Sequence, residues 1–355
     1  MTTTAAPDAA RSAAFVEKLK ATYNAGMLTM MINLGHETGL WEALAQGPGT
    51  SAELAQRASL SERHVREWLG SVTVGGVVEY DAPSKTYSFP QEHAFWLTGP
   101  RYTNLAPMSG MVMGLAQRLD DVAVAFRNGG GVPYDNYRPH FTHSMDVLGR
   151  AKYDELLVNA YLPSAPGLIE RLSSGVDVAD VGCGTGHCLN LMAAAFPASR
   201  FVGFDFSSGA LELARAEAQR MGLGNVRFDV ADVRHLPTDP GFDVIFAFDA
   251  IHDQADPAGV LGRIREALHV DGMFFMVDIK ASSHLEDNLA EPATMMMYGM
   301  SVLHCMEVSL AYDGAGLGTV WGTQLATAML HDAGFGDVII HDIRADPSNC
   351  IYVCR

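Results

Sequence analysis

The stretch VDVADVGCGTGHC at 176–188 constrains the possible fold more than any other part of the sequence. An alternating apolar run ends at Asp180, glycines follow at every second position, and an apolar, helix-like run begins at Leu189. This pattern predicts a strand, a tight loop and a helix. Glycine lets a loop backbone approach a ligand with no Cβ in the way, and the first helical turn offers free N–H groups beside it. We therefore expect a ligand site that includes Asp180, Gly182, Gly184 and Gly186.

The loop departs from the fingerprint of dinucleotide-binding sites, although the two share a strand–loop–helix layout. That fingerprint requires glycine at its first, third and sixth positions, and the sixth position here is His187. A nicotinamide-dependent oxidoreductase is therefore a disfavoured alternative. The other alternative is a purely structural turn between a buried strand and a helix. That alternative does not explain the ordered strands and acidic residues that follow after residue 200.

The order acidic-x-Gly-x-Gly-x-Gly resembles motif I of the class I S-adenosylmethionine (SAM) dependent methyltransferases. Other positions of the same family pattern are found further along the chain. RFVGFD at 200–205 predicts a second strand that ends in Asp205, an acid suited to bridging two ribose hydroxyls. The resemblance implies that Asp232 accepts the adenine amino group and that Val233 packs on the ring. The cofactor implied is SAM, and the residues expected to bind it are Asp180, Gly182, Gly184, Gly186, Asp205, Phe206, Asp232, Val233 and Phe248.

The C-terminal half predicts an α/β fold with a Rossmann-like sheet over residues 171–355. FDVIFAF is a fourth strand, and a helix starts near Asp256 and Pro257. GMFFMVDIK at 272–280 is a fifth strand, and a last helix covers roughly 320–333. Two terminal strands, at about 337–343 and 348–354, are close enough to form the antiparallel hairpin that ends the sheet in the family resembled.

Composition limits the class of protein. With 355 residues and 48% hydrophobic content, the chain can bury a large core and form about two domains. Its net charge is −17, and no cluster of Lys and Arg is present to hold a polyanion, so we expect no nucleic-acid partner. The five cysteines show no zinc spacing, which favours reduced thiols in a cytoplasmic protein without a metal. The sequence has neither the apolar core of a signal peptide nor an uncharged run of roughly 18 apolar residues, so no membrane association is expected.

Residues 1–100 predict a winged helix-turn-helix. One or two amphipathic helices cover 13–45, Thr50 or Ser51 can cap a further helix with Glu53 in its first turn, and Ser61 can cap another. VGGVVEYD and KTYSF then form a small β-wing. DNA binding would need a basic excess, but this region holds seven Lys and Arg against ten Asp and Glu. A SAM-binding transcriptional regulator is therefore kept only as an alternative.

The whole order resembles that of small-molecule O-methyltransferases of the plant and actinobacterial type. Their N-terminal winged-helix domain serves dimerisation, so the resemblance implies a homodimer built by residues 1–100. Residues 101–170 predict a helical connector with a break at NGGGVPYDNYRPHF. Residues 281–322, which carry five methionines between 295 and 306, are inserted after the fifth strand. Methionines at helical spacing usually belong to a core, but the carboxyl edge of an open sheet is where ligands bind, and we expect a lid over an apolar pocket.

The segment IHDQAD after the fourth strand resembles the HDxxD signature of the same O-methyltransferases, in which the histidine is the general base. The resemblance implies that His252 removes a proton from the methyl acceptor and that Asp278, at the end of the fifth strand, orients it. The alternative is a helix entry in which His252 packs and Asp256 is the N-cap. A second orienting acid of the family is missing here, because Val320 and Trp321 occupy its place.

The acceptor is expected to be a small, largely apolar molecule, methylated at a phenolic oxygen. Nitrogen and carbon acceptors remain alternatives. His140 and His143 are spaced for one helix face, with Asp146 three residues further on, a spacing that would also suit a metal. No metal is predicted, and a contact with the acceptor is favoured instead. The residues expected to line the pocket are His140, His143, Met300, His304 and Trp321.

Overall fold

The computed structural model describes residues 8–355, and the chain divides into two units, Met1–Gly114 and Leu115–Arg355. The boundary falls inside helix α6 (Ala106–Ala116), within the segment predicted as a helical connector. No helix among residues 8–355 is long and apolar enough to cross a membrane.

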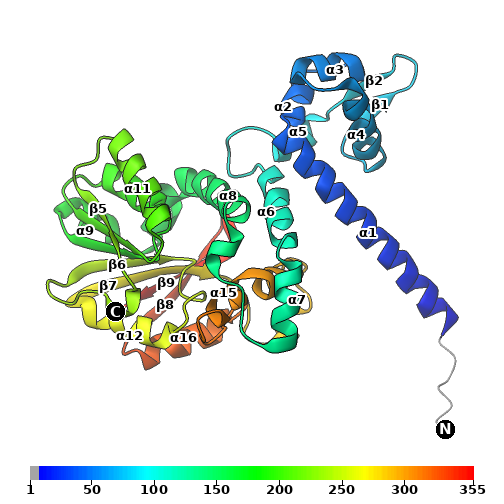
Figure 1. Cartoon of the computed structure of the whole chain (residues 1–355). Coiled ribbons are helices and arrows are strands. Elements are labelled where there is room, and N and C mark those ends of the chain that lie inside the picture. The colour runs from blue at the N-terminus through cyan, green and yellow to red at the C-terminus, as the bar shows by residue number, and fades with distance from the viewer. Residues whose placement is uncertain (1–7) are drawn as a thin grey trace, which may run out of the picture. The chain divides into compact units, whose positions relative to one another are not determined.

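The first unit has the predicted helices and wing (Figure 1). The region expected to hold one or two helices holds two, separated at Gly39, whose φ of +71° requires glycine or a similarly permissive residue. The wing is a two-stranded antiparallel sheet. The elements are α1 (Ala9–Glu37), α2 (Leu40–Ala45), α3 (Ser51–Ala58), α4 (Glu62–Val74), β1 (Glu79–Asp81), β2 (Thr86–Ser88) and α5 (Gln91–Leu97).

The two predicted caps of this unit have different outcomes. Thr50 and Glu53 form a reciprocal capping box at the start of α3, as the sequence predicts. Ser61 occupies the N-cap position of α4, but its side chain makes no capping bond to the backbone. Its hydroxyl instead lies 3.0 Å from Nδ1 of His64. The predicted N-cap position of Ser61 is therefore confirmed, and the predicted capping hydrogen bond was wrong.

Two tryptophans anchor the C-terminal end of α1 in the core of the first unit. The indole N–H of Trp41 donates to Ile32 O at 3.0 Å, and that of Trp68 donates to Met31 O at 2.8 Å. A Cβ on Gly35 would lie 2.5 Å from the Trp41 ring, so the close approach requires glycine there. Nearer the N-terminus, α1 exposes large apolar side chains, namely Phe15, Tyr23, Met27 and Met30.

The second unit is built on a seven-stranded sheet of order β5-β4-β3-β6-β7-β9-β8. The first five of these strands are parallel, and β9 runs antiparallel to both β7 and β8. The Rossmann-like sheet with an antiparallel C-terminal hairpin is thus confirmed. The strands are β3 (Asp177–Val181), β4 (Arg200–Asp205), β5 (Val226–Val230), β6 (Phe242–Phe248), β7 (Leu268–Ile279), β8 (Val338–Ile343) and β9 (Asp346–Cys354).

Helices cover both faces of this sheet (Figure 1). On one face lie α9 (Leu168–Ser174) and α11 (Ser208–Arg220), and on the other lie α12 (Pro257–Ala267) and α16 (Gly322–Asp332). Helix α10 (His187–Ala195) packs against α11. Asp256 caps α12 by accepting from the backbone N–H of Gly259 at 2.9 Å, which confirms that part of the helix-entry interpretation. Because β3 has β4 on one side and β6 on the other, the chain reverses its winding there, and its carboxyl edge is the expected place for a ligand.

The break after α7 contacts the 281–322 segment. Val132 N donates to Glu307 O at 3.2 Å, and the Tyr137 hydroxyl donates to Leu303 O at 2.7 Å, so the break after α7 packs against the 281–322 segment. These parts comprise α7 (Leu119–Asn128), the 3₁₀ turn Tyr134–Tyr137, α8 (His140–Leu156), α13 (Leu285–Asn288), α14 (Thr294–Met300), the π turn Ser301–Cys305 and α15 (Met306–Leu310).

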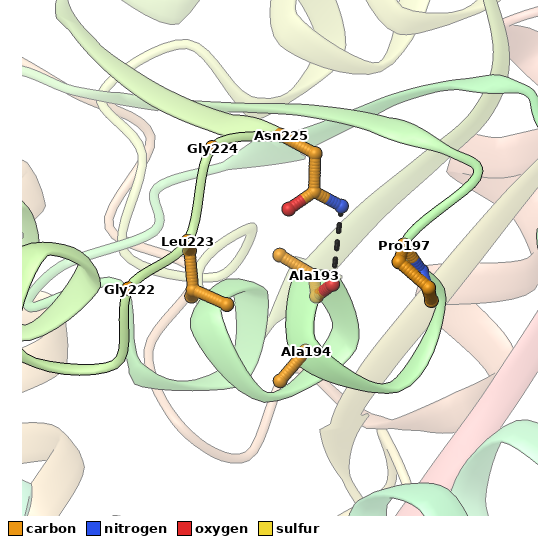
Figure 2. Close-up of a pocket in the computed structure, with 7 residues that line it drawn as sticks. All are labelled: Ala193, Ala194, Pro197, Gly222, Leu223, Gly224 and Asn225. Atoms are coloured by element: carbon orange, nitrogen blue, oxygen red, sulfur yellow. Dashed lines mark hydrogen bonds between the residues drawn. The ribbon is translucent and has the colours of Figure 1, made fainter.

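An open hollow on the second unit lies away from that edge (Figure 2). Its lining residues come from the C-terminal end of α10 and from the loops that precede β4 and β5, for example Pro197 and Leu223. The Asn225 amide donates to Ala193 O across it at 3.1 Å. Since this is the amino-terminal edge of the parallel strands, the hollow is not the site that the glycine loop predicts.

Candidate active site

The three glycines of the loop after β3 have different surroundings, although all have positive φ. A Cβ on Gly182 would lie 2.7 Å from the Ala250 side chain, and one on Gly186 would lie 2.5 Å from the Phe228 ring. A Cβ on Gly184 would meet no described atom within 4 Å. Gly182 and Gly186 are therefore required by packing, whereas Gly184 borders open space at the carboxyl edge of the sheet.

Asp205, the last residue of β4, holds this loop in place. Its carboxylate accepts the backbone N–H of Gly184 at 2.9 Å and that of Ser207 at 2.8 Å, so it joins the loop to the start of α11. Asp180 is buried behind the loop, and among residues 8–355 its Oδ1 has no hydrogen-bond partner. Burial and then the charge of Asp205 raise the pKa of Asp180 to about 8.

Phe206 and Phe248, at the carboxyl ends of β4 and β6, each pack against a tyrosine. Phe206 is 55% exposed, and Tyr134 lies edge-on to it with ring centroids 5.9 Å apart. Burial, followed by the charge of Asp205, raises the pKa of Tyr134 to about 12, so its phenol stays protonated and can donate a hydrogen bond. Phe248 packs edge-on against Tyr153 at 5.4 Å. Tyr134 was not among the residues predicted from the sequence.

The two residues expected at the adenine have other contacts in the structure. Asp232 pairs with the Arg234 guanidinium through Oδ2 and Nη2 at 2.6 Å. Val233 is buried in the core cluster of the sheet. Contacts of Asp232 and Val233 with an adenine ring therefore remain predictions.

His252 and Asp278 meet at the carboxyl ends of β6 and β7. The two side chains are buried, and His252 Nδ1 lies 2.8 Å from Asp278 Oδ1. Burial alone lowers the pKa of His252, but the charges of Asp278 and Asp253 outweigh it and raise that pKa well above its usual value. The tautomer that donates Nδ1–H to the carboxylate leaves the Nε2 lone pair available as a proton acceptor.

Trp321 has a role that the sequence did not reveal. It was expected as an aromatic wall of the pocket, in the place of a second orienting acid, and it is buried with its indole N–H 3.1 Å from Asp278 Oδ1. The backbone N–H of Ile279 donates to the same oxygen at 2.8 Å. Because an indole only donates, Trp321 adds a third hydrogen bond to the Asp278 carboxylate where an acid would add a charge.

The 281–322 segment, predicted to be a lid, contributes His304 and Cys305, and Cys305 lies next to this pair. His304 is buried between the rings of Tyr137, at 4.5 Å, and Phe141, at 4.4 Å. Burial lowers its pKa to about 4, so the imidazole is neutral at physiological pH. Its Nδ1 lies 3.6 Å from Cys305 Sγ, and its Nε2 has no partner in the described part of the chain. The predicted place of His304 at the pocket is thus compatible with the structure.

The other predicted pocket residues are not brought together. His140 and His143 are exposed on α8, and Asp146 turns instead to Thr185 and Arg150. Met300 is half-buried at the end of α14. Contacts of these three predicted residues with an acceptor stay predictions.

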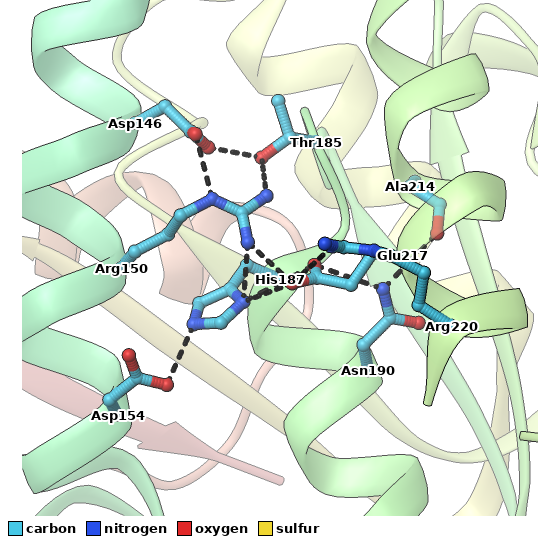
Figure 3. A network of polar contacts seen from close by, with 9 residues as sticks. All are labelled: Asp146, Arg150, Asp154, Thr185, His187, Asn190, Ala214, Glu217 and Arg220. Carbon is cyan, nitrogen blue, oxygen red and sulfur yellow. Dashed lines mark hydrogen bonds and ion pairs between the residues drawn. The ribbon is translucent and has the colours of Figure 1, made fainter. Parts of the chain in front are cut away.

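A polar network fixes α8 to the glycine loop (Figure 3). Asp146 accepts from Thr185 Oγ1 at 2.5 Å and from Arg150 Nε at 2.7 Å, while Arg150 Nη1 lies 2.5 Å from Glu217 Oε1 on α11. His187 Nε2 is 3.1 Å from Asp154. Side chains of the connector therefore set the position of the loop that would hold a cofactor.

Comparison with protein-family models matches both parts of the chain. Residues 172–334 match a model described as a methyltransferase domain, and residues 26–99 match a model described as an Rv2258c-like winged HTH domain. The chain carries a class I SAM-dependent methyltransferase domain. A winged helix-turn-helix domain precedes it.

Curated relatives align with parts of this methyltransferase domain. The trans-aconitate 2-methyltransferase of Methylobacterium nodulans is 32% identical over 126 residues, which cover 36% of this chain and 44% of that protein. The aklanonic acid methyltransferase DauC of a Streptomyces species is 30% identical over 148 residues, which cover 39% of this chain and 64% of that protein. The chain thus spans less than two thirds of the length of either relative.

A solved structure matches the whole chain, including the methyltransferase domain and the domain before it. Human N-acetylserotonin methyltransferase, crystallised with SAM, superposes with a TM-score of 0.70 at 17% identity. The match covers 99% of this chain and 99% of that one. At this identity the likeness establishes the fold.

Proposed function

We propose that the chain transfers the methyl group of SAM to the oxygen of a small, largely apolar acceptor, with a phenol as the expected class. The observation that carries this proposal is the buried His252–Asp278 pair beside the glycine loop. Ala250, two residues before His252, is the residue that a Cβ on Gly182 would touch, so the base and the loop share one edge of the sheet.

The loop fits SAM in three respects. Gly184 leaves space for a ligand, Asp205 presents a buried carboxylate with lone pairs left for ribose hydroxyls, and Oδ1 of Asp180 is buried without a partner among residues 8–355. When bound there, SAM would supply an electrophilic methyl group. Phe206 and Phe248 lie at the carboxyl ends of β4 and β6, and the proposal expects both to contact the cofactor.

The side chains around His252 fit the removal of an acceptor proton. His252 Nε2 would take the proton, and Asp278 would stabilise the resulting imidazolium through Nδ1–H. Trp321 and Ile279 hold the Asp278 carboxylate in register with the ring. The neutral His304 and the protonated Tyr134 supply hydrogen-bonding groups on the lid side, where exclusion of water favours the displacement.

The test is turnover with SAM labelled at its methyl group, using the full chain and a panel of phenols, amines and carbon acids. The proposal expects label in a phenolic ether and in no member of the other two groups. Label only in amines or carbon acids would contradict the oxygen acceptor, and failure of the chain to bind SAM in calorimetry would contradict the whole proposal.

The proposal includes a cytoplasmic homodimer formed by the first unit. Helix α1 exposes a run of large apolar side chains, an area that a second copy would cover. Light scattering should report a dimer for the full chain, and Met27→Glu should shift it towards monomer. Leu213→Glu, at an apolar residue of α11 with a similar exposure, is the control. A monomeric wild type at micromolar concentration would contradict the dimer.

A further inference from the structure

Three side chains with metal-binding atoms meet where the lid covers the end of β6. A ring nitrogen of His252, a carboxylate oxygen of Asp253 and Sγ of Cys305 all lie within 4.8 Å of one another. His252 Nε2 and Asp253 Oδ1 are 3.3 Å apart. His252 and Cys305 are buried, and the cysteine comes from the π turn of the lid, far along the chain from the other two.

Two further observations point to a ligand between these atoms. Asp253 Oδ1 is buried and faces His252 Nε2 at 3.3 Å, so a proton on Nε2, or a cation in its place, would satisfy both atoms. His252 Nδ1 is engaged by Asp278, which leaves Nε2 facing the cluster. A carboxylate behind a histidine in this way orients the ring and raises its basicity towards a metal.

The donor set selects among cations. Imidazole, thiolate and carboxylate together suit Zn²⁺, whereas Mg²⁺ and Ca²⁺ take oxygen ligands. With Zn–S near 2.3 Å and Zn–N near 2.0 Å, the ligand atoms of a tetrahedral ion lie roughly 3.3–3.8 Å from one another. Small side-chain rotations would bring the three donor atoms to those distances. Three protein ligands leave the fourth position open.

We propose that His252, Asp253 and Cys305 form a site for a thiophilic divalent cation, with Zn²⁺ as the probe, and that the bound ion inhibits methyl transfer by occupying Nε2 of His252. Binding breaks the S–H bond of Cys305 and, where the imidazole is protonated, the Nε2–H bond of His252. The metal–sulfur and metal–nitrogen bonds form in their place, and the protons are released to solvent. The inhibition rests on the proposed function, whereas the binding does not.

The binding test uses the full chain freed of metal by a chelator. Zn²⁺ is titrated in competition with a chromophoric chelator, and Co²⁺ is followed by the sulfur-to-cobalt charge-transfer absorption. We expect one ion per chain, and an affinity lower by about 100-fold or more in Cys305→Ala together with loss of that absorption. Cys350→Ala, at a buried thiol of β9 outside the cluster, should bind as the wild type does. Equal Zn²⁺ affinity in Cys305→Ala and the wild type would overturn the proposal.

The activity test separates this inference from the proposed function. Each protein is compared with its own metal-free rate. Zn²⁺ should lower that rate in the wild type and in Cys350→Ala, the same Zn²⁺ concentration should leave the rate of Cys305→Ala at that variant's metal-free value, and all three should bind SAM equally. Inhibition that is identical in Cys305→Ala would overturn the inhibitory role. If the metal-free chain methylates no acceptor, the proposed function fails, and the Zn²⁺ titration still decides the site.

Discussion

The cofactor half and the acceptor half of the candidate site are built from different kinds of contact. The glycine loop and Asp205 come from the adjacent strands β3 and β4, and Asp205 holds the loop through backbone N–H groups. The acceptor half joins His252, Asp278, Trp321 and the lid, segments that are far apart in sequence and meet through side chains.

This difference separates two properties of the domain. Backbone contacts in the loop should determine whether SAM binds, because they depend on glycine conformation and on one carboxylate. Side-chain contacts around His252 should determine how fast the methyl group moves and to which acceptor. Substitutions in one half are therefore expected to leave the other half's measured property unchanged, and the predictions for His252 and Trp321 test that separation directly.

The largest effect is expected from His252→Ala. Loss of the general base should lower kcat by about a hundred- to ten-thousandfold, while calorimetry reports an unchanged affinity for SAM. The comparison between the halves fails if SAM affinity falls by the same factor as kcat, since His252 would then belong to the cofactor half.

The next effect concerns the cofactor half. Asp205→Ala removes the carboxylate that would accept a ribose hydroxyl, a charge-assisted hydrogen bond worth roughly 1.5–3 kcal/mol, so the Kd for SAM should rise about ten- to a hundredfold. Gly184→Val should also weaken binding, because its side chain would enter the open space beside the loop. Gly222→Val is the matched control, since Gly222 also has positive φ and no described atom within 4 Å of its Cβ position. Equal loss of SAM affinity in both glycine variants would show that backbone strain alone is responsible.

A smaller effect is expected from Trp321→Phe, which removes one donor to Asp278 and keeps an aromatic ring. The loss of a hydrogen bond of about 0.5–1.5 kcal/mol should lower kcat roughly two- to tenfold, with no change in SAM affinity.

Because the neutral imidazole is the base, and the pKa of His252 is raised, the wild-type rate should rise with pH above the ordinary histidine range. With one donor fewer, the Asp278 charge acts more strongly on the ring, so the variant's profile should move to higher pH. A lower rate with an unchanged pH dependence would show that Trp321 contributes by packing and not through its hydrogen bond to Asp278.

The smallest effect concerns stability in the absence of SAM. In the unfolded chain Asp180 ionises near its ordinary value of 3.8, whereas the folded chain holds its proton up to about pH 8. The free energy of unfolding should therefore fall as the pH rises from about 4 to about 8. Asp180→Asn cannot ionise and should raise Tm at pH 8, by an amount corresponding to about 1–3 kcal/mol, with little change at pH 4. A Tm difference that is the same at both pH values would contradict this assignment of the proton.

The contrast between the halves also explains what could be predicted from the sequence. The sheet, the glycine loop and the terminal hairpin follow from local alternation and from glycine spacing, which depend on neighbouring residues. The closeness of His252 and Asp278 follows from the rule that parallel strands end at one edge. The capping bond expected of Ser61 was wrong because its hydroxyl had a competing local partner in His64.

The contacts that sequence analysis missed depend on the path of the lid and of the connector. Nothing in the local pattern shows that the Trp321 indole points at Asp278, or that a π turn brings Cys305 to His252. Tyr134 follows a run of glycines, so its place between Phe206 and His304 could not be derived from periodicity. These contacts are long-range and involve side chains, which is why the acceptor half was predicted less completely than the cofactor half.

The most direct test of the central claim, that His252 removes the acceptor proton, is the rate of His252→Ala relative to the wild type on a series of phenols that differ only in pKa. A base is needed less as the phenol becomes more acidic, so the deficit should shrink steadily and be smallest for acceptors that are already ionised at the assay pH. A deficit that is the same across the whole series would contradict the claim and leave His252 with a role in positioning the acceptor.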